Sequence, residues 1–539
     1  MKRKRTKVSC IPCHEQKRKC DKMIPCGTCV KGKRTCYYEN TGVSQPEARR
    51  KNEDNVHGVL AIHNNGWSKY TSGTFWANIG SMHTNVADYL NDNEEGSAFL
   101  GSGKKYYSLF FDSPGVVPPL KEELMAVIPP EDHGNFLLDR FEMAVNSIFP
   151  LCDVATVRER YQRVQHENDY SVLSLLFAVF YAASFSLEVG TTPSFIPSDK
   201  GSLQHVYFSA LEQSLRALGF PHTCTLQSLQ ACVIFELCNM QEHSSLSPMV
   251  PVLVRQAQTM GLHRDGELFE LEKCVVKERR MTWWNIVFLD WHDSSCRDLN
   301  PLIRGDEYDT KFPEKDCVAT IISNCRVQSL ITSSGVLRKL YGLNRCSYTD
   351  FLKTQEMISD HDAMCERTKQ DLEQYDTLAA KYGSAGMKTL IHKLKLLTAP
   401  YYAKPGKAHV TTCEDILPLL DSAVEYIDAL AQLYTNNDFK DFMWFTKNFQ
   451  PFHAVTLILS YIYRYPNTPK RQELVNALDS AFLYIQPYGG ENWVALNQMK
   501  TKIIGGTMDQ IYWPDWESLF FSFPEAKNLF ASEDGIKEY

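Results

Sequence analysis

The chain has little that could enter a membrane or direct secretion. One stretch of its 539 residues, Tyr170 to Leu187, runs for 18 residues without a charge, which is near the lower limit for a spanning helix, and it contains four serines. We expect a buried core helix there. The basic N-terminus has no apolar segment behind it, so the sequence predicts no secretory signal peptide.

Motifs for nucleotide binding and catalysis are also missing. Residues 100–105, LGSGKK, end in two lysines where a phosphate-binding loop needs a lysine followed by serine or threonine. His263 and Asp265 lie two positions apart, yet no nucleophile elbow or metalloprotease signature accompanies them. We interpret them as a helix-terminal histidine and a turn-capping aspartate, and we expect no enzyme activity.

Charge is divided unevenly along the chain. Residues 1–40 hold twelve Lys/Arg against three acids, a net charge of +9, whereas the other 499 residues carry −16. A basic head on an acidic body indicates that the head binds a polyanion.

Six of the 17 cysteines lie in the head and repeat the spacing C-x2-C-x6-C twice. Structural zinc takes four ligands in a tetrahedron, so two zinc ions need eight ligand positions, which six thiolates supply if two of them bridge. There are two alternatives. One is a disulfide framework, which a reducing compartment disfavours. The other is a pair of separate four-ligand sites that include His14, which is disfavoured because His14 directly follows Cys13. The expected ligands are Cys10, Cys13, Cys20, Cys26, Cys29 and Cys36.

This spacing, with Asp21 after the third cysteine and Pro25 before the fourth, resembles the fungal Zn2Cys6 binuclear cluster transcription factors. The resemblance implies two Zn2+ ions, with Cys10 and Cys26 as the bridging ligands. It also implies that the loop proline, Pro25, joins two similar halves. Double-stranded DNA with CGG-type triplets is then the expected partner, read in the major groove.

Basic side chains cluster in the first half of the repeat, where Cys13 to Cys20 leave room for about two helical turns. Lysine contacts to guanine are among the common specific contacts in the major groove, and we expect Lys17 to be the main base reader. Arg18 and Lys19 would contact bases or nearby phosphates, with Lys7 and Lys22 as further DNA-binding residues. The run Lys2 to Arg5 suits phosphate anchoring or a nuclear localisation signal.

Residues 41–117 have the composition of a linker and a partly ordered connector. Many members of the family dimerise through a coiled coil at this place, which requires a heptad of apolar residues. Residues 40–65 lack that period. Binding to one half-site as a monomer and a homodimer paired through the body therefore both remain open.

Residues 118–470 show apolar residues at three- and four-residue intervals, so we expect a large all-α domain and a mostly α protein. A helix beginning near Pro251 should end at Gly261, and Val276 to Trp291 should form another, with Trp284 in the core. The order of motifs here resembles the family's middle homology region, which is regulatory. That resemblance implies a small-molecule effector as a further candidate partner.

The last segment, residues 471–539, is expected to hold helices and an acidic, aromatic tail. Acidic and aromatic residues alternate in residues 512–539, as in activation segments that bind coactivators, and an amphipathic tail packed on the body fits the pattern equally. Residues 1–40 are the expected DNA-binding domain.

Together these patterns predict a nuclear, sequence-specific transcription factor for RNA polymerase II genes, with no membrane partner. A zinc-binding scaffold whose head engages protein or RNA is the alternative, followed by an enzyme with an appended metal knot.

Overall fold

A computed structural model describes twelve stretches of the chain: residues 9–23, 26–32, 58–62, 68–72, 121–164, 169–187, 200–240, 248–296, 299–342, 346–402, 417–489 and 492–505. The chain separates into two compact units, residues 1–54 and 55–539, which we call the head and the body. In the described part of the head, the two helices are α1 (Ile11–Glu15) and α2 (Gly27–Lys31).

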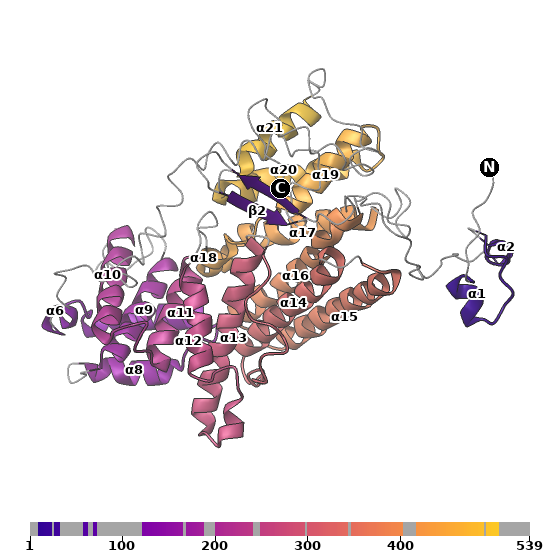
Figure 1. Ribbon diagram of the computed structural model, residues 1–539. Coiled ribbons are helices and arrows are strands. Elements are labelled where there is room, and N and C mark those ends of the chain that lie inside the picture. Colours follow the sequence, from indigo (N-terminus) through magenta and orange to yellow (C-terminus); the bar gives the residue numbers. More distant parts are fainter. Residues whose placement is uncertain are drawn as a thin grey trace. The chain divides into compact units, whose positions relative to one another are not determined.

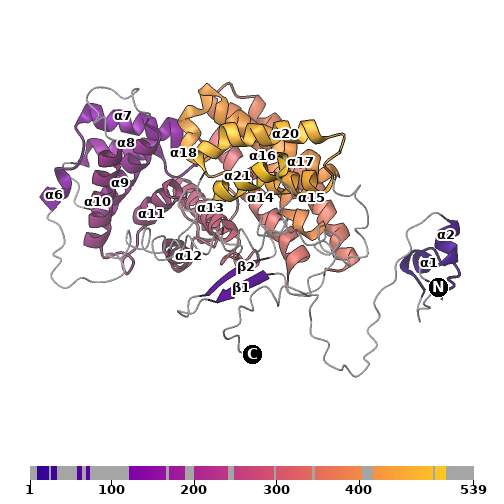
Figure 2. The same ribbon diagram turned by 90° about the horizontal axis from the view of Figure 1, so that it is seen from above.

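The body begins with a short antiparallel hairpin of β1 (Gly58–Ile62) and β2 (Ser68–Ser72), in the register Gly58 opposite Ser72 and Ile62 opposite Ser68. Strand β1 therefore lies within residues 40–65, the segment that lacks a heptad period. The other secondary-structure elements among the described residues of the body are helices, as the sequence predicts (Figures 1 and 2).

The first group of helices in the body surrounds one apolar helix, α9. The group comprises α6 (Lys121–Met125), α7 (Glu131–Phe141) with the π-helical turn Glu142–Asn146, α8 (Val154–Gln162), α9 (Tyr170–Phe185), α10 (Lys200–Leu218) and α11 (Leu226–Cys238). Helix α9 packs against α7, α10 and α11 and is buried over almost its whole length. A helix that is apolar all round is stable only inside a core, so the prediction of a buried core helix is confirmed.

No helix among the described residues combines the length and apolarity that crossing a bilayer requires.

Two helices and a long loop form the middle of the body. Helix α12 (Met249–Thr259) ends where Gly261 adopts φ = +70°, as predicted, since glycine takes this left-handed conformation without a steric penalty. After the 3-10 turn Gly266–Phe269 comes α13 (Lys273–Cys296), longer than predicted, with Trp284 buried as expected. The ring of Trp284 stacks on Phe312, 3.9 Å between centroids, which holds the loop after α13 against the helix.

Three long helices follow and pack on one another: α14 (Val318–Tyr341), α15 (Tyr348–Glu373) and α16 (Leu378–Tyr402). The buried Arg326 on α14 places its guanidinium carbon 3.9 Å from the ring centroid of Phe149 and 4.9 Å from that of Phe445, and it donates to the Ile148 carbonyl oxygen at 3.1 Å. Burial lowers its pKa to about 10, so it is still charged at neutral pH. This cation therefore ties α14 to segments nearly 180 residues before it and 120 after it.

The remaining helices cover α16. They are α17 (Leu417–Thr435), the 3-10 turn Asn437–Phe442, α18 (Met443–Thr446), α19 (Phe452–Arg464), α20 (Arg471–Ser480), the π-helical turn Ala481–Ile485, the 3-10 turn Gln486–Tyr488 and α21 (Asn492–Ile504). Helix α17 packs on α16 on one side and on α19 and α20 on the other. In both views the α6–α11 group lies at one end of the body and α14–α17 at the other, with α13 between them (Figures 1 and 2).

A buried ion pair fixes the turn between α12 and α13. Both carboxylate oxygens of Asp265 accept from the Arg280 guanidinium, at 2.8 and 2.9 Å, and the side chains are 3% and 8% exposed. Asp265 also accepts from the backbone N–H groups of Glu267 and Lys311. Burial opposes ionisation of Asp265, but the Arg280 and backbone donors outweigh it and lower its pKa to about 2. The expected turn-capping role of Asp265 is confirmed, and the ion pair is an addition to it.

Asp265→Asn should lower the free energy of unfolding at neutral pH by about 3–5 kcal/mol, because it leaves Arg280 buried without its bidentate partner. The pair contributes its full stability above the ordinary aspartate pKa, about 3.9, and loses it as the pH falls towards 2. The difference in unfolding free energy between the wild type and Asp265→Asn should therefore shrink over that pH range. Chemical denaturation at several pH values measures this. Asp306→Asn, which removes a carboxylate from the exposed Arg304–Asp306 pair, is the matched control and should change little. Equal stability of the two variants would contradict the role of Asp265.

Candidate metal centre and nucleic-acid interface

The two C-x2-C segments of the head fold in the same way. Cys10 and Cys26 are the N-cap residues of α1 and α2, with extended backbone angles of φ −64°, ψ 151° and φ −73°, ψ 146°. In each copy the carbonyl oxygen of this first cysteine accepts from the backbone N–H groups three and four residues further on, at 3.1 and 3.0 Å. The repeated cysteine spacing thus produces a repeated turn that directs both sulfurs to one side.

Four sulfur atoms meet between these turns. The Sγ atoms of Cys10, Cys13, Cys26 and Cys29 all lie within 4.8 Å of one another, and these four residues are buried. The Sγ of Cys10 lies 3.6 Å from that of Cys26 and 3.7 Å from that of Cys29, and Cys13 lies 3.6 and 3.8 Å from the same two.

These separations fit zinc. A tetrahedral ion with Zn–S bonds of about 2.3 Å has ligand sulfurs about 3.8 Å apart, whereas a disulfide needs about 2.05 Å. All the cysteines that the structure describes are free thiols, and the head has no disulfide among its described residues. The cysteine group is therefore suited to hold a metal ion.

A fifth cysteine extends the group. The Sγ of Cys20 lies 3.8 Å from the Sγ of Cys10, and Cys20, Asp21 and Cys26 form a second set of candidate ligand atoms within 4.8 Å of one another. Cys10 and Cys26 therefore belong to the four-sulfur set and also lie near Cys20, as bridging ligands would have to. The sixth expected ligand, Cys36, falls outside the described residues.

Local donors already favour a thiolate in this cluster. Burial opposes ionisation of Cys26, but the Cys29 backbone N–H, 3.3 Å from its sulfur, and the neighbouring thiols donate to it and lower its pKa to about 6. Burial raises the pKa of Cys10 and Cys13. Several thiolates at these distances repel one another, and a bound cation would remove that repulsion while releasing protons.

The expected DNA-reading residues follow α1 rather than forming part of it. The helix ends at Glu15, so the expectation of two helical turns between Cys13 and Cys20 is wrong. It ends because Lys17 adopts φ = +48°, with its N–H donating to the His14 carbonyl oxygen at 3.1 Å and the next N–H to that of Cys13 at 2.8 Å. This is a left-handed helix cap, for which glycine is the usual residue.

Lys17, Arg18 and Lys19 are exposed side by side in this cap segment, and the structure gives their side chains no partner among the described residues. Lys22 is half-buried, with φ = +58° and its N–H donating to Cys20 Sγ at 3.4 Å. Of the five expected DNA-binding residues, the structure thus brings three together on an exposed segment, while Lys7 falls outside the described residues.

Two polar side chains hold the cap segment to the second half of the repeat. Asp21 accepts from the Gly27 N–H at 2.8 Å and from the Met23 N–H at 3.1 Å, and Thr28 Oγ1 donates to the Lys19 carbonyl oxygen at 2.8 Å. A Cβ at Gly27 would lie 2.8 Å from Asp21 Oδ2, so any other residue there would displace this carboxylate. The sequence pattern includes Asp21 but gives no indication of the role of Thr28, which lies inside the second C-x2-C turn.

Family comparisons agree with this site. The fungal Zn(2)-Cys(6) binuclear cluster domain matches residues 8–41, and the fungal specific transcription factor domain matches residues 138–378. The two stretches together span about half of the chain.

Curated relatives are similar along much of the chain. A transcriptional regulatory protein of Schizosaccharomyces pombe is 22% identical over 97% of this chain and 94% of its own length. The aurofusarin cluster transcription factor of Gibberella zeae is 22% identical, covering 84% of this chain and 72% of its own length. A transcription factor of Penicillium terrestre is 22% identical, with 76% and 55% covered.

The fold, the cysteine group and these matches define the class as a zinc-cluster transcription regulator of the DNA-binding type. The chain belongs to the fungal Zn2Cys6 transcription factors that carry the fungal-specific middle domain, a family that binds zinc and DNA. The relatives are regulators and not enzymes, as the sequence predicts, and action as a transcription factor implies work in the nucleus.

Asp21→Ala should loosen the head, because it removes the acceptor that joins the third cysteine's segment to the start of α2. We expect zinc to be lost to a competing chelator at a concentration about fivefold to tenfold lower, corresponding to about 1 kcal/mol or more for a charge-assisted hydrogen bond. Lys31→Ala, at an exposed position of α2, is the control. If Asp21→Ala and Lys31→Ala release zinc at the same chelator concentration, Asp21 has no organising role.

Proposed function

We propose that the protein is a sequence-specific transcription factor whose head holds two Zn2+ ions through six cysteines and reads CGG-type triplets in the major groove. One observation carries the proposal. Four buried sulfurs are spaced as in a zinc tetrahedron, and an exposed segment with three adjacent cations lies between Cys13 and Cys20 in the chain.

The positions of the sulfurs support a stoichiometry of two ions. Five cysteines gather in one group, and a single tetrahedral zinc ion uses four. Cys10 and Cys26 each have sulfurs on two sides, which suits thiolates that bridge two ions. With Cys36 as the sixth ligand, each ion has four sulfurs. Bound zinc would supply the positive charge that lets these thiolates lie together.

Base reading is assigned to the cap segment. A left-handed residue at Lys17 turns the chain sharply away from α1, so the next side chains leave a tightly constrained backbone. A non-glycine residue in this conformation costs about 1 kcal/mol, a strain that functional segments often retain. Lys17 would contact guanine O6 and N7, with Arg18 and Lys19 on bases or phosphates and Lys7 and Lys22 as further contacts.

The wider roles follow from this assignment. Residues 1–40 would be the DNA-binding domain, 41–117 a connector, 118–470 the regulatory domain and 471–539 helices with a tail suited to coactivators. The protein would act in the nucleus on RNA polymerase II genes, as a monomer or as a homodimer formed without a coiled coil. The regulatory domain would respond to a small-molecule effector.

Purified full-length protein should contain two zinc equivalents per chain, measured by atomic emission spectroscopy. Cys29→Ser should lose at least one equivalent, because it removes one of the four buried sulfurs. Cys274→Ser, at an exposed thiol of the body, should keep both. A wild-type content of one equivalent or none, or equal contents in the two variants, would refute the two-ion cluster.

Lys17→Gly should weaken binding to a CGG duplex by about 1–3 kcal/mol while leaving binding to a scrambled duplex nearly unchanged. Glycine suits the left-handed conformation at this position, so the variant removes the ammonium group without straining the head. Titration of labelled duplexes at a fixed salt concentration measures both affinities, and Lys31→Ala is the matched loss of an exposed cation. Equal losses on the two duplexes would exclude Lys17 as a reader. Preferential binding of RNA over either duplex would favour the scaffold alternative.

A further inference from the structure

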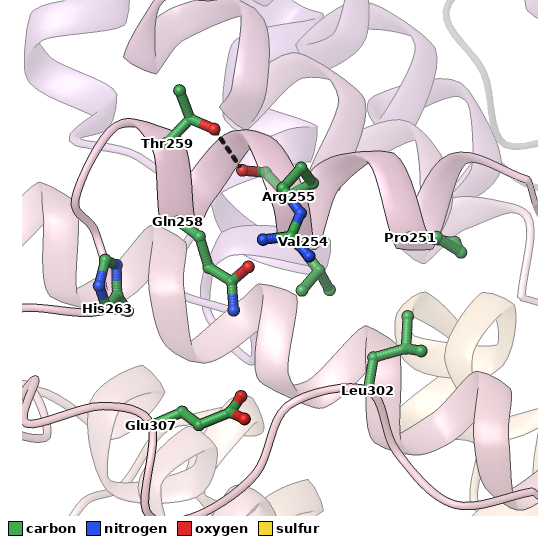
Figure 3. Close-up of a pocket in the computed structure, with 8 residues that line it drawn as sticks. All are labelled: Pro251, Val254, Arg255, Gln258, Thr259, His263, Leu302 and Glu307. Carbon is green, nitrogen blue, oxygen red and sulfur yellow. Dashed lines mark hydrogen bonds between the residues drawn. The ribbon is translucent and has the colours of Figure 1, made fainter.

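A cavity of about 840 Å3 lies in the body between α12 and the loop that follows α13 (Figure 3). Its size is within the range of small-ligand sites, about 300–1,000 Å3. Residues of α12 form one wall, the loop forms the other, and His263 lies at one end. The lining residues that matter for the argument are Val254, Arg255, Gln258, His263, Leu302 and Glu307.

The two walls carry opposite charges. Arg255 projects from α12 and Glu307 from the loop across from it (Figure 3). Neither side chain forms an ion pair or a hydrogen bond within the described part of the chain. The neighbouring Arg264 and Arg304, in contrast, are paired with Asp309 and Asp306. A cation and an anion that face one cavity without pairing are available to a ligand with both charges.

Polar atoms in the wall also lack partners. Gln258 Oε1 and His263 Nδ1 are enclosed by protein and make no hydrogen bond in the part of the chain that is described. Buried polar atoms nearly always have a partner. Both atoms have almost no accessible surface, so the Gln258 oxygen could meet a ligand in the cavity only after the amide turns. The amide of Gln258 extends into the space between Arg255 and Glu307 (Figure 3), where rotation of its last torsion would let it pair with another amide.

The other end of the cavity is apolar. Val254, Leu302 and Pro251 line it, and Leu302 is 52% exposed although it belongs to a well-anchored loop. The loop is anchored because the buried Asp290 accepts from the backbone N–H groups of Leu302 and Ile303, at 3.1 and 2.8 Å. The exposed leucine is thus held in place and offers an apolar contact to a ligand.

We propose that this cavity is the effector site of the regulator proposed above and that it binds a short apolar peptide, two or three residues long, with free ends. The ligand carboxylate would pair with Arg255, its ammonium group with Glu307 and a peptide group with Gln258. An apolar side chain would contact Val254 and Leu302. A peptide fits better than a single amino acid, because the amide and the two charges have to be matched together across a cavity of this size.

Isothermal titration of the full-length protein with leucyl-leucine tests the proposal. We expect one saturable site per chain. N-acetylation should weaken binding about tenfold by removing the partner of Glu307, and C-terminal amidation about tenfold by removing the partner of Arg255. Leucine alone should bind more weakly than the dipeptide. If the acetylated peptide binds as tightly as the free one, the site recognises only a carboxyl end, such as a protein C-terminus, and the proposal for a free peptide is wrong.

Variants separate the site from general effects of charge. Arg255→Gln and Glu307→Gln should each weaken leucyl-leucine binding about tenfold, and each should make the protein indifferent to blocking of the corresponding peptide end. Arg367→Gln and Glu356→Gln, at exposed positions of α15, are the matched controls and should bind as the wild type does. Absence of saturable binding, or wild-type binding by both cavity variants, would overturn the proposal.

Titration of the same preparations with the CGG duplex tests the DNA-binding function separately from the effector site. A protein that binds the duplex but not the peptide leaves the DNA-binding function intact and excludes this effector. A protein that binds neither contradicts the proposed function itself.

Discussion

The interior of the described head consists of sulfur. Its only buried cluster there is made by Cys10, Cys13, Cys26 and Cys29, with Cys20 packed against it, and no leucine, isoleucine or phenylalanine contributes. So small a unit cannot gain enough from apolar burial to offset the entropy of ordering its chain. Metal–thiolate bonds can supply that free energy, so the folding of the head is coupled to zinc. Lys17, Arg18 and Lys19 lie on the backbone between Cys13 and Cys20, so their positions depend on this cluster.

The cysteine cluster and two polar side chains hold the cap segment in place. The cysteine turns bring the end of α1 against the start of α2, and Asp21 and Thr28 bind backbone groups across that junction. The side chains of Lys17, Arg18 and Lys19 therefore project from a backbone segment that is held at both ends, by Cys13 and by Cys20. A long, flexible lysine loses less entropy on binding DNA when its backbone is already fixed.

The body is stabilised in a different way. Apolar helices supply the bulk of its core, and a few buried polar groups decide how its loops run. Asp265 and Asp290 each accept from backbone N–H groups of the segment after α13, while Arg326 joins distant segments through aromatic rings. These anchors hold the loop that carries Leu302 and Glu307, which forms one wall of the cavity beside α12.

The sequence by itself determined what short-range chemistry decides: the paired cysteine turns, the buried helix α9, the glycine stop at Gly261 and the core position of Trp284. Each depends on neighbours within a few residues or on a helical period, which are visible in one dimension. The helix before Lys17 is shorter than the sequence suggests, because Lys17 takes a left-handed conformation that is usual for glycine and that no glycine there announces. Only the tertiary structure decided that Asp265 meets Arg280 and that Arg255 faces Glu307. Those partners lie 15 and 52 positions apart along the chain, and no local pattern records which distant charge will be folded opposite another.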